Sequence, residues 1–206
     1  METYPQTRWD LTPLLQAPSG EPVERALNDI ETRTANFEQA RAKLKSEIDE
    51  EEFLDFVHEY DGLNRVLRNI GYYAELWFTE DTQNQQALAF KTKIEQMTTQ
   101  VANRVLFFTL WWKELDDENA ARLLRNAGDY TYFLESERMF KPHTLAEREE
   151  QIINLKDVSG IGGLLNVYDM ITNRYMFNLT VNGEEKKLTY GELMTYARHP
   201  DANIRA

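Results

Sequence analysis

The sequence contains no cysteine, which excludes disulfides, thiolate nucleophiles and cysteine metal ligands together. Histidine, proline and glycine are also scarce, with three, six and nine copies among 206 residues. Because helix-breaking residues are few and 42% of the residues are hydrophobic, the composition is typical of a globular protein and excludes the disordered and collagen-like classes. A chain of this length can bury a sizeable core.

Basic residues are also fewer than acidic ones. The chain has 35 acidic and 23 basic residues, so its formal net charge is -12. This charge repels phosphate backbones and anionic lipids, which argues against a nucleic-acid partner and against a role at a membrane surface.

Long apolar runs are also absent. The densest run, residues 105–112, is interrupted by Thr109 and is far shorter than the roughly 20 residues of a membrane span. Residues 1–10 contain no apolar run behind a basic stretch, so we expect no secretory signal and a cytoplasmic protein.

The first half of the chain carries three hydrophobic stripes at helical spacing. Between residues 51 and 78 the apolar side chains recur at alternate steps of three and four, which is an unbroken heptad pattern. A second stripe covers residues 87–115, and a weaker one follows Pro22 over residues 23–48. Short joints between the stripes predict three long antiparallel helices. Residues 105–108 are apolar on all sides, which predicts that they are the most deeply buried part.

Shorter elements are predicted in the second half. We expect helices over residues 117–127, 144–156 and 159–173, and one more that starts at Pro200-Asp201. The predicted fold is therefore mainly α, with an antiparallel long-helix bundle over residues 1–116 and shorter helices with one β-hairpin over residues 117–206. Because the last helix is only about one turn long, we expect the sequence to continue in a longer protein.

The hairpin and the helix starts have their own local signals. The hydrophobic period changes to two over residues 176–188, with Phe177, Leu179 and Val181 on one face, and Asn182-Gly183 predicts a type I′ turn at the tip. Four residue pairs have the spacing of an N-terminal helix cap. They are Asp49 with Glu52, Thr82 with Gln85, Thr144 with Glu147, and Thr189 with Glu192.

The three histidines do not form a recognisable metal site. His58-Glu59 begins a His-Glu-x-x-His zinc motif, but Gly62 stands where the second imidazole is required. Asp55 and His58 supply half of a carboxylate-bridged di-iron pattern, and no second copy exists. His143 is interpreted as a loop residue at a helix entry and His199 as a residue at a helix end. We therefore predict no catalytic, cofactor-binding or metal-binding residue in this chain.

For the serines, the glycine-rich segment and the paired aromatic residues, a structural role explains the sequence better than a functional site does. None of the serines lies in a Gly-x-Ser-x-Gly nucleophile elbow. The glycine-rich residues 159–163 follow a helix rather than a strand and lack the lysine of a phosphate-binding loop, so close packing of helices explains the glycines better. Tyr72-Tyr73 and Trp111-Trp112 could line a ligand groove, although core packing is the default for aromatic residues at helical spacing.

Several segments resemble one family of peptidases. The most specific is Arg138 to Glu150, which is similar to the pattern Arg-x-x-x-Pro-His-x-Leu-x-x-x-x-Glu. The opening Arg8-Trp9-Asp10-Leu11-Thr12 is similar to the Trp-Asp-Leu-Ser/Thr start of the same family. Likeness continues through Ser159-Gly160, Tyr168-Asp169 and Arg198-His199-Pro200-Asp201. In order along the chain, these segments resemble the amino-terminal part of the oligoendopeptidase F family of zinc metallopeptidases, relatives of the thimet-type oligopeptidases.

The resemblance implies an intracellular endopeptidase that cleaves short peptides. Zinc would be held by a His-Glu-x-x-His helix and a later glutamate in a downstream catalytic domain, so this chain itself would bind none. The amino-terminal helices would form one wall of the substrate channel, and their partners would be the catalytic domain and the peptides. The sequence does not decide whether Tyr72, Tyr73, Trp77 or other residues face the channel. The alternative is a stand-alone helical module that binds a peptide or protein in an apolar groove without cleaving it.

Overall fold

The structure is a computed structural model that describes residues 8–181 and 183–205. It divides into two compact units, Met1–Val158 and Ser159–Ala206. The fold is mainly α with one two-stranded antiparallel sheet, as the sequence predicts. Within the described residues, no helix combines the length and apolar character needed to cross a bilayer.

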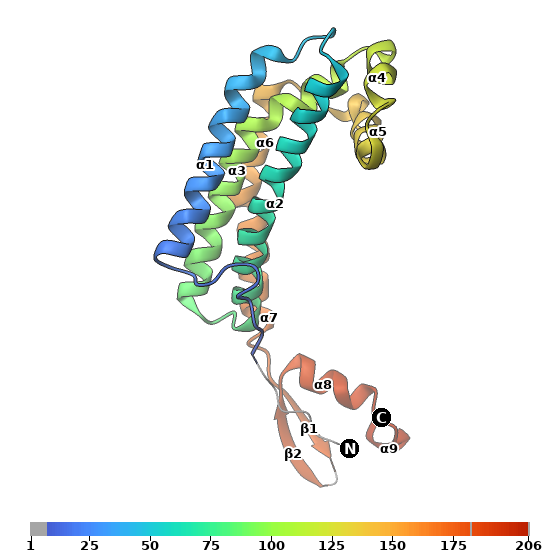
Figure 1. Cartoon of the computed structure of the whole chain (residues 1–206). Helices are drawn as coiled ribbons and strands as arrows, with labels where there is room; N and C mark the ends of the chain where they lie inside the picture. Colours follow the sequence, from blue (N-terminus) through green and yellow to red (C-terminus); the bar gives the residue numbers. More distant parts are fainter. Residues whose placement is uncertain (1–7, 182, 206) are drawn as a thin grey trace. The chain divides into compact units, whose positions relative to one another are not determined.

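Three long helices form the body of the first unit. They are α1 (Glu21–Ala40), α2 (Glu50–Glu80) and α3 (Gln85–Glu114). The three helices lie side by side and alternate in direction, which confirms the predicted antiparallel arrangement (Figure 1). Their apolar stripes meet in one core, where the Phe53 ring stacks on Trp112 at 5.1 Å and the Phe37 ring meets Phe108 edge to face at 5.6 Å. Val105, Phe107 and Phe108 are at most 4% exposed, whereas Leu106 is only partly buried.

The apolar stripe over residues 23–48 extends beyond the end of helix α1. Helix α1 ends at Ala40, a 3-10 turn follows over Arg41–Lys43, and Leu44 has an extended backbone. Ile48 is nevertheless buried, and the Arg122 guanidinium donates hydrogen bonds to the carbonyls of Ser46 and Ile48. The prediction of a helix up to residue 48 is wrong because these last apolar positions belong to a loop that packs into the core.

Two of the predicted helix caps are confirmed. Asp49 accepts a hydrogen bond from the Glu51 N–H at the start of α2, although Glu52 forms an ion pair with Lys43. Thr189 and Glu192 form a complete capping box at the start of a helix in the second unit.

The other two caps are wrong because the helices begin later than predicted. Asn84, rather than Thr82, caps α3 and accepts hydrogen bonds from the N–H groups of Gln86 and Ala87. The Thr144 hydroxyl donates to the carbonyl of Phe140 and makes no cap for the helix that follows.

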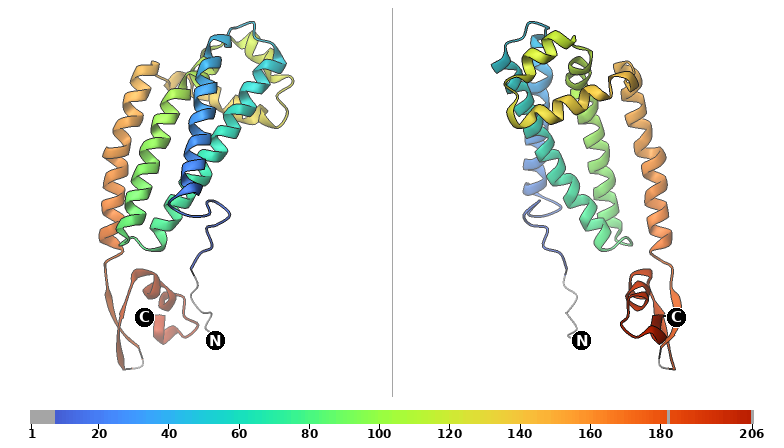
Figure 2. Two further views of the ribbon diagram at one scale, coloured as in Figure 1. Left: turned by 60° about the vertical axis from the view of Figure 1, so that its left-hand side comes forward. Right: turned by 90° about the vertical axis from the view of Figure 1, so that its right-hand side faces the viewer.

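Three shorter helices pack on the long ones. They are α4 (Asp117–Leu124), α5 (Thr131–Met139) and α6 (Glu147–Asp157). Helix α4 contacts α2, whereas α5 and α6 contact α3, and α6 lies beside α3 in both views of Figure 2. Helix α5 was not predicted from the sequence. Because these helices belong to the same compact unit as α1, α2 and α3, the units divide after Val158 and not at the predicted boundary near residue 116.

The second unit contains the hairpin. A π-helical turn, Val158–Gly162, comes before α7 (Gly163–Thr172), so Ser159 does not begin a helix. Strand β1 (Phe177–Val181) pairs antiparallel with β2 (Glu184–Leu188), and α8 (Tyr190–Ala197) and α9 (Ala202–Arg205) follow. Gly183 has a positive φ of 84°, as the predicted turn requires, while Asn182 lies outside the described residues.

Gly160, in the glycine-rich stretch, does not lie at a close contact between helices. A Cβ atom added at Gly160 would meet nothing within 4 Å, so the predicted packing explanation is wrong at this position. Gly160 lies instead within the π-helical turn.

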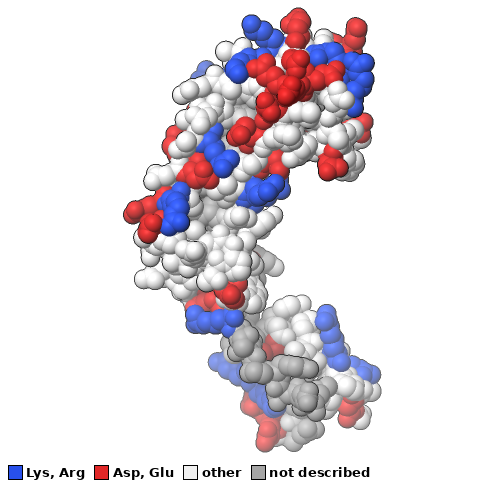
Figure 3. Space-filling view, viewed as in Figure 1, with Lys and Arg blue, Asp and Glu red and all other residues white. Residues whose placement is uncertain are grey.

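Charged side chains are unevenly distributed over the first unit. Acidic and basic residues gather at the end where α1 leads into α2, and a largely uncharged surface covers the bundle next to them (Figure 3). The ion pairs of Lys43 with Glu52 and of Arg125 with Glu50 belong to this charged end.

Candidate functional site

A groove between α2, α3 and α6 is the candidate site. Its volume is about 340 Å³, which is at the small end of the range for ligand pockets. The lining side chains are apolar or neutral except for one arginine, and none is a carboxylate. They are Tyr60, Asn64, Leu67, Arg68, Gly71, Tyr72, Thr98, Ala102, Val105, Leu106, Thr109 and Asn154.

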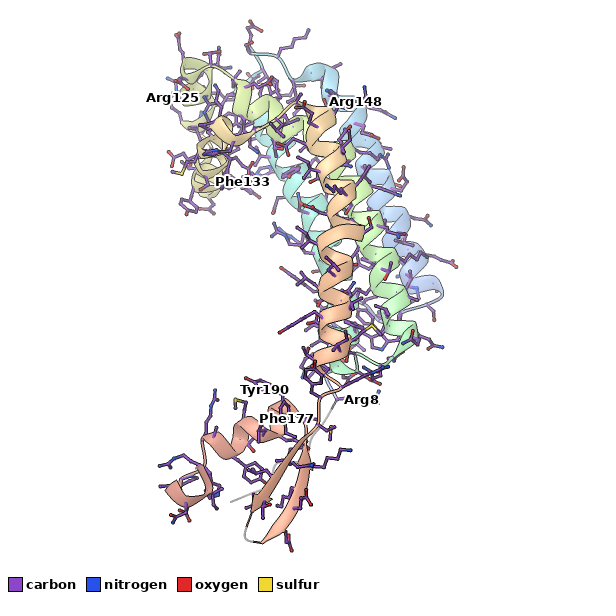
Figure 4. The ribbon with its side chains drawn as sticks, turned by 180° about the vertical axis from the view of Figure 1, so that it is seen from behind. Arg8, Arg125, Phe133, Arg148, Phe177 and Tyr190 are labelled. Carbon is purple, nitrogen blue, oxygen red and sulfur yellow. The ribbon has the colours of Figure 1, made fainter. Side chains whose placement is uncertain are left out.

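Tyr60 lines the groove, and its ring also packs against rings of the core. Its ring lies 5.2 Å from that of Phe108 and 6.3 Å from that of Phe133 on α5. Figure 4 shows Phe133 at the end of the unit where α6 begins near Arg148. Burial raises the pKa of the Tyr60 phenol, so the hydroxyl stays protonated at neutral pH.

Two asparagines place amide oxygens at the groove. Asn64 donates its side-chain N–H to the carbonyl of Tyr60 at 2.8 Å. Asn154 donates to the Asn103 Oδ1 at 2.8 Å, and Asn103 and Gln151 exchange side-chain to backbone hydrogen bonds that fasten α6 to α3. Each of the two groove asparagines also carries an Oδ1 atom that can accept a hydrogen bond.

Arg68 supplies the positive charge of the groove. Its side chain is exposed and, among the described residues, makes neither an ion pair nor a hydrogen bond. Arg65, one turn earlier on α2, is paired with Asp61 at 3.1 Å and does not line the groove.

The three aromatic candidates of α2 have different environments. Tyr72 is 57% exposed and lines the groove. Tyr73 is 7% exposed, and its ring packs against Trp77 and Phe90 in the core. Trp77 is partly buried in the same cluster, so Tyr72 alone of the three faces the groove.

Sequence reasoning missed Asn64 and Arg68 as groove residues, although a signal exists. Tyr60, Asn64, Arg68 and Tyr72 follow one another at steps of four, which places them in one row along α2. This row borders the apolar stripe, so it was open to prediction as the edge of a groove. Asn154 could not have been found in this way because the packing of α6 on α3 is a tertiary contact.

The three histidines belong to three different elements or turns of the chain. His58 is exposed on α2, with its ring 5.4 Å from that of Tyr130, and His143 is exposed in a 3-10 turn. His199 accepts a hydrogen bond from the Asp201 N–H through Nδ1. No group of three or more metal-ligating side chains that could hold an ion occurs within residues 8–181 and 183–205. The absence of a metal site remains a prediction.

The predicted motif at Arg138 has a clear structural role. The Arg138 guanidinium donates to the carbonyl of Trp112 at 2.7 Å and to Asp117 at 2.6 Å, and it lies over the Trp112 ring at 5.4 Å. The Trp112 indole N–H in turn donates to the carbonyl of Leu134 on α5. At the other end of the motif, Glu150 accepts a hydrogen bond from the Leu145 N–H. The motif therefore fixes α5 against α3 and shapes the entry to α6.

Trp111 and Trp112, the other aromatic residues considered for a ligand groove, do not line the groove between α2, α3 and α6. Trp112 is buried in the core, and Trp111 lines a separate small pocket beside the Arg41–Glu147 ion pair.

These features define the class of protein as an α-helical bundle domain with a largely uncharged groove. Residues 111–177 match a family model described as Oligopeptidase F, which represents the amino-terminal part of peptidase M3 proteins. The match runs from the last turn of α3 to the first residue of β1 and includes the whole Arg138 to Glu150 segment. It confirms the predicted resemblance to the amino-terminal domain of an oligoendopeptidase F-like protein. The comparisons with curated proteins and with solved structures gave no match.

Proposed function

We propose that this chain is the non-catalytic amino-terminal domain of an oligoendopeptidase F-like zinc metalloendopeptidase, and that its groove forms part of the wall of the substrate channel. The observation that carries this proposal is the position of the groove. One of its sides is α6, which lies wholly within the segment that matches the family model.

The chemistry of the groove suits a short peptide. Ala102, which is exposed, and Leu106, which is partly buried, offer apolar surface that a peptide side chain can cover. The amide oxygens of Asn64 and Asn154 can accept hydrogen bonds from peptide N–H groups, and the exposed Tyr72 ring adds a rigid contact surface.

Zinc has no fitting set of ligands in the described part of this chain. A catalytic zinc ion needs about three protein ligands and one open position, and the described residues contain no group of three or more side chains that could hold an ion. In the proposed enzyme, the metal is therefore held by the downstream catalytic domain.

Helix α7 supports the proposed partnership with such a domain. Leu164, Leu165 and Val167 are between 52% and 72% exposed on this helix. An apolar surface of this kind is typical of a protein interface. The downstream catalytic domain is the proposed partner.

Peptide binding tests the role of the groove. We expect Gly-Ala-Ala-Phe-Leu with a fluorescent label on its amino terminus and a free carboxyl terminus to bind the chain, and Tyr72→Ala to weaken binding by about fivefold because a ring contact is lost. Tyr168→Ala is the matched control, since Tyr168 is similarly exposed but lies on α7. Equal effects of the two substitutions, or no binding by the unmodified chain, would contradict the proposal.

The same groove supports a second candidate, a stand-alone helical module that binds peptides without cleaving them. The coding sequence separates the two candidates. A His-Glu-x-x-His helix encoded in the same reading frame supports the peptidase, whereas a reading frame without that motif supports the module.

A further inference from the structure

Arg68 differs from other cations that line pockets of the first unit. Arg25 is paired with Glu21, Arg41 with Glu147, and Lys43 with Glu52. Arg68 has no such partner within the described part of the chain. In a protein with a net charge of -12, it is a guanidinium that remains available to an external anion.

The surroundings of Arg68 leave room for that anion. Gly71 lies three residues further along α2 in the same groove, and a Cβ atom added there would meet nothing within 4 Å. No carboxylate lines the groove, so a negatively charged group entering it meets no repelling partner at close range. The Glu137 carboxylate on α5 contributes to the raised pKa of Tyr60. It is itself paired with Lys113, with 3.1 Å between Nζ and Oε2.

We infer that the groove binds the carboxyl-terminal end of a short peptide, with Arg68 pairing with the α-carboxylate and the last side chain covering Tyr72 and Leu106. This inference rests on the proposed function and names the part of the peptide that the groove recognises. The groove volume of about 340 Å³ suits one or two terminal residues better than a long extended segment.

The position of the charge distinguishes the peptide end from an acidic side chain. Arg68 and Tyr72 lie one turn apart on α2, so a positive charge and an exposed aromatic ring lie close together in the groove. A terminal apolar residue carries its side chain and its carboxylate on the same Cα atom and can use both features at once. An internal aspartate or glutamate offers a carboxylate in place of the apolar side chain.

The test compares three peptides on the whole chain. They are acetyl-Gly-Ala-Ala-Phe-Leu as the free acid, the same peptide as the carboxyl-terminal amide, and acetyl-Gly-Ala-Phe-Leu-Asp amide, which carries its only carboxylate on a side chain. We expect the free acid to bind about tenfold more tightly than either amide, because a charge-assisted hydrogen bond is lost with the terminal carboxylate.

Two variants assign the effect to Arg68. Arg68→Gln is expected to remove the tenfold preference for the free acid, whereas Arg65→Gln, one turn away and outside the groove, should keep it. Circular dichroism of both variants checks that the helices are unchanged. Raising the salt concentration should weaken the free acid more than the amide, since an exposed ion pair is screened.

The outcomes separate this inference from the proposed function. Equal binding of all three peptides, with no change in Arg68→Gln, contradicts the carboxylate site and leaves the peptide groove intact. Equal binding of the free acid and the aspartate peptide contradicts recognition of the peptide end. Binding of none of the peptides contradicts both the groove function and this inference.

Discussion

Arg138 shows how one residue can join several elements of a fold. Its guanidinium satisfies the carbonyl of Trp112 on α3, contacts Asp117 at the start of α4 and covers an indole ring. The side chain is only 14% exposed, so the charge is partly removed from water and depends on these partners. The most specific motif of the sequence therefore has a structural role in this fold.

Replacing Arg138 tests this structural role. We expect Arg138→Met to lower the free energy of unfolding by about 2 kcal/mol, since a charge-assisted hydrogen bond and a cation–π contact are lost together. Urea denaturation measures the change. Arg148→Met, an exposed position in the same family segment, is the control and should change stability by less than about 0.5 kcal/mol. Similar losses in both variants would contradict the assignment.

The ion pair between Arg104 and Glu31 should make the free energy of unfolding depend on pH. The hydrogen bond from Arg104 lowers the pKa of Glu31 below its ordinary value of 4.5, and Glu38 accepts a second hydrogen bond from the same guanidinium. Since the folded state lowers the pKa of Glu31, this stabilisation is fully present above about pH 4.5. It is lost as the pH falls through the lowered pKa.

The Arg104→Met variant should therefore differ most from the unmodified chain near neutral pH. The difference is expected to stay within about 1 kcal/mol because Glu31 is largely exposed. Urea denaturation at pH 7 and at pH 3 measures it. A difference that grows on acidification would have the wrong sign and would refute this account.

At this scale the sequence predicts more about the core than about the groove. The sequence alone does not show which of Tyr72 and Tyr73 is buried. The packing of α2 against α3 leaves the Tyr72 ring exposed and buries the Tyr73 ring. The isolation of His58 follows from the failed zinc motif and could be predicted. That Arg68 lacks an ion-pair partner among the described residues could not be predicted, because it depends on where the carboxylates of the fold lie.

Helix caps give a test at the scale of the element. Asn84 satisfies two N–H groups in the first turn of α3, so Asn84→Ala should lower the free energy of unfolding by about 1 kcal/mol. Asn84→Asp keeps an acceptor at the same position and should retain most of the stability. Thermal denaturation of the two variants checks the assignment, and an equal loss in both would contradict it.

The predictability of each element depends on the origin of its stability. Helices α2 and α3 carry long apolar stripes and β1 alternates between faces, so periodicity predicts these three elements. Strand β2 has no such alternation, and its prediction depends on the Asn182-Gly183 turn signal. Helix α5 is short and buries only Leu134, and it is held by the hydrogen bond from Trp112 and by Arg138. Such contacts come from distant parts of the chain, so local sequence does not predict this helix.

The two compact units differ in how much apolar surface they bury. Within the described residues, Val181 and Leu188 are the only buried hydrophobic residues of the second unit, and each is 9% exposed. The other buried hydrophobic residues lie in the first unit. A small unit with so little core is marginal by itself, whereas the first unit holds a continuous aromatic core.

Truncation tests this difference. A fragment of residues 1–158 should unfold cooperatively in urea, with a midpoint close to that of the whole chain. A fragment of residues 159–206 should show no cooperative transition. Circular dichroism follows both fragments, and a gradual loss of helix in the longer one would refute the proposed independence of the first unit.

The central claim at the scale of the whole molecule is that a short peptide binds in the groove of the first unit. The most direct measurement is an NMR titration of the isotope-labelled chain with acetyl-Gly-Ala-Ala-Phe-Leu. We predict that the largest shifts of backbone signals fall between Tyr60 and Tyr72 on α2, between Thr98 and Thr109 on α3, and at Asn154. Shifts confined to the second unit, or no shifts at saturating peptide, would contradict the account.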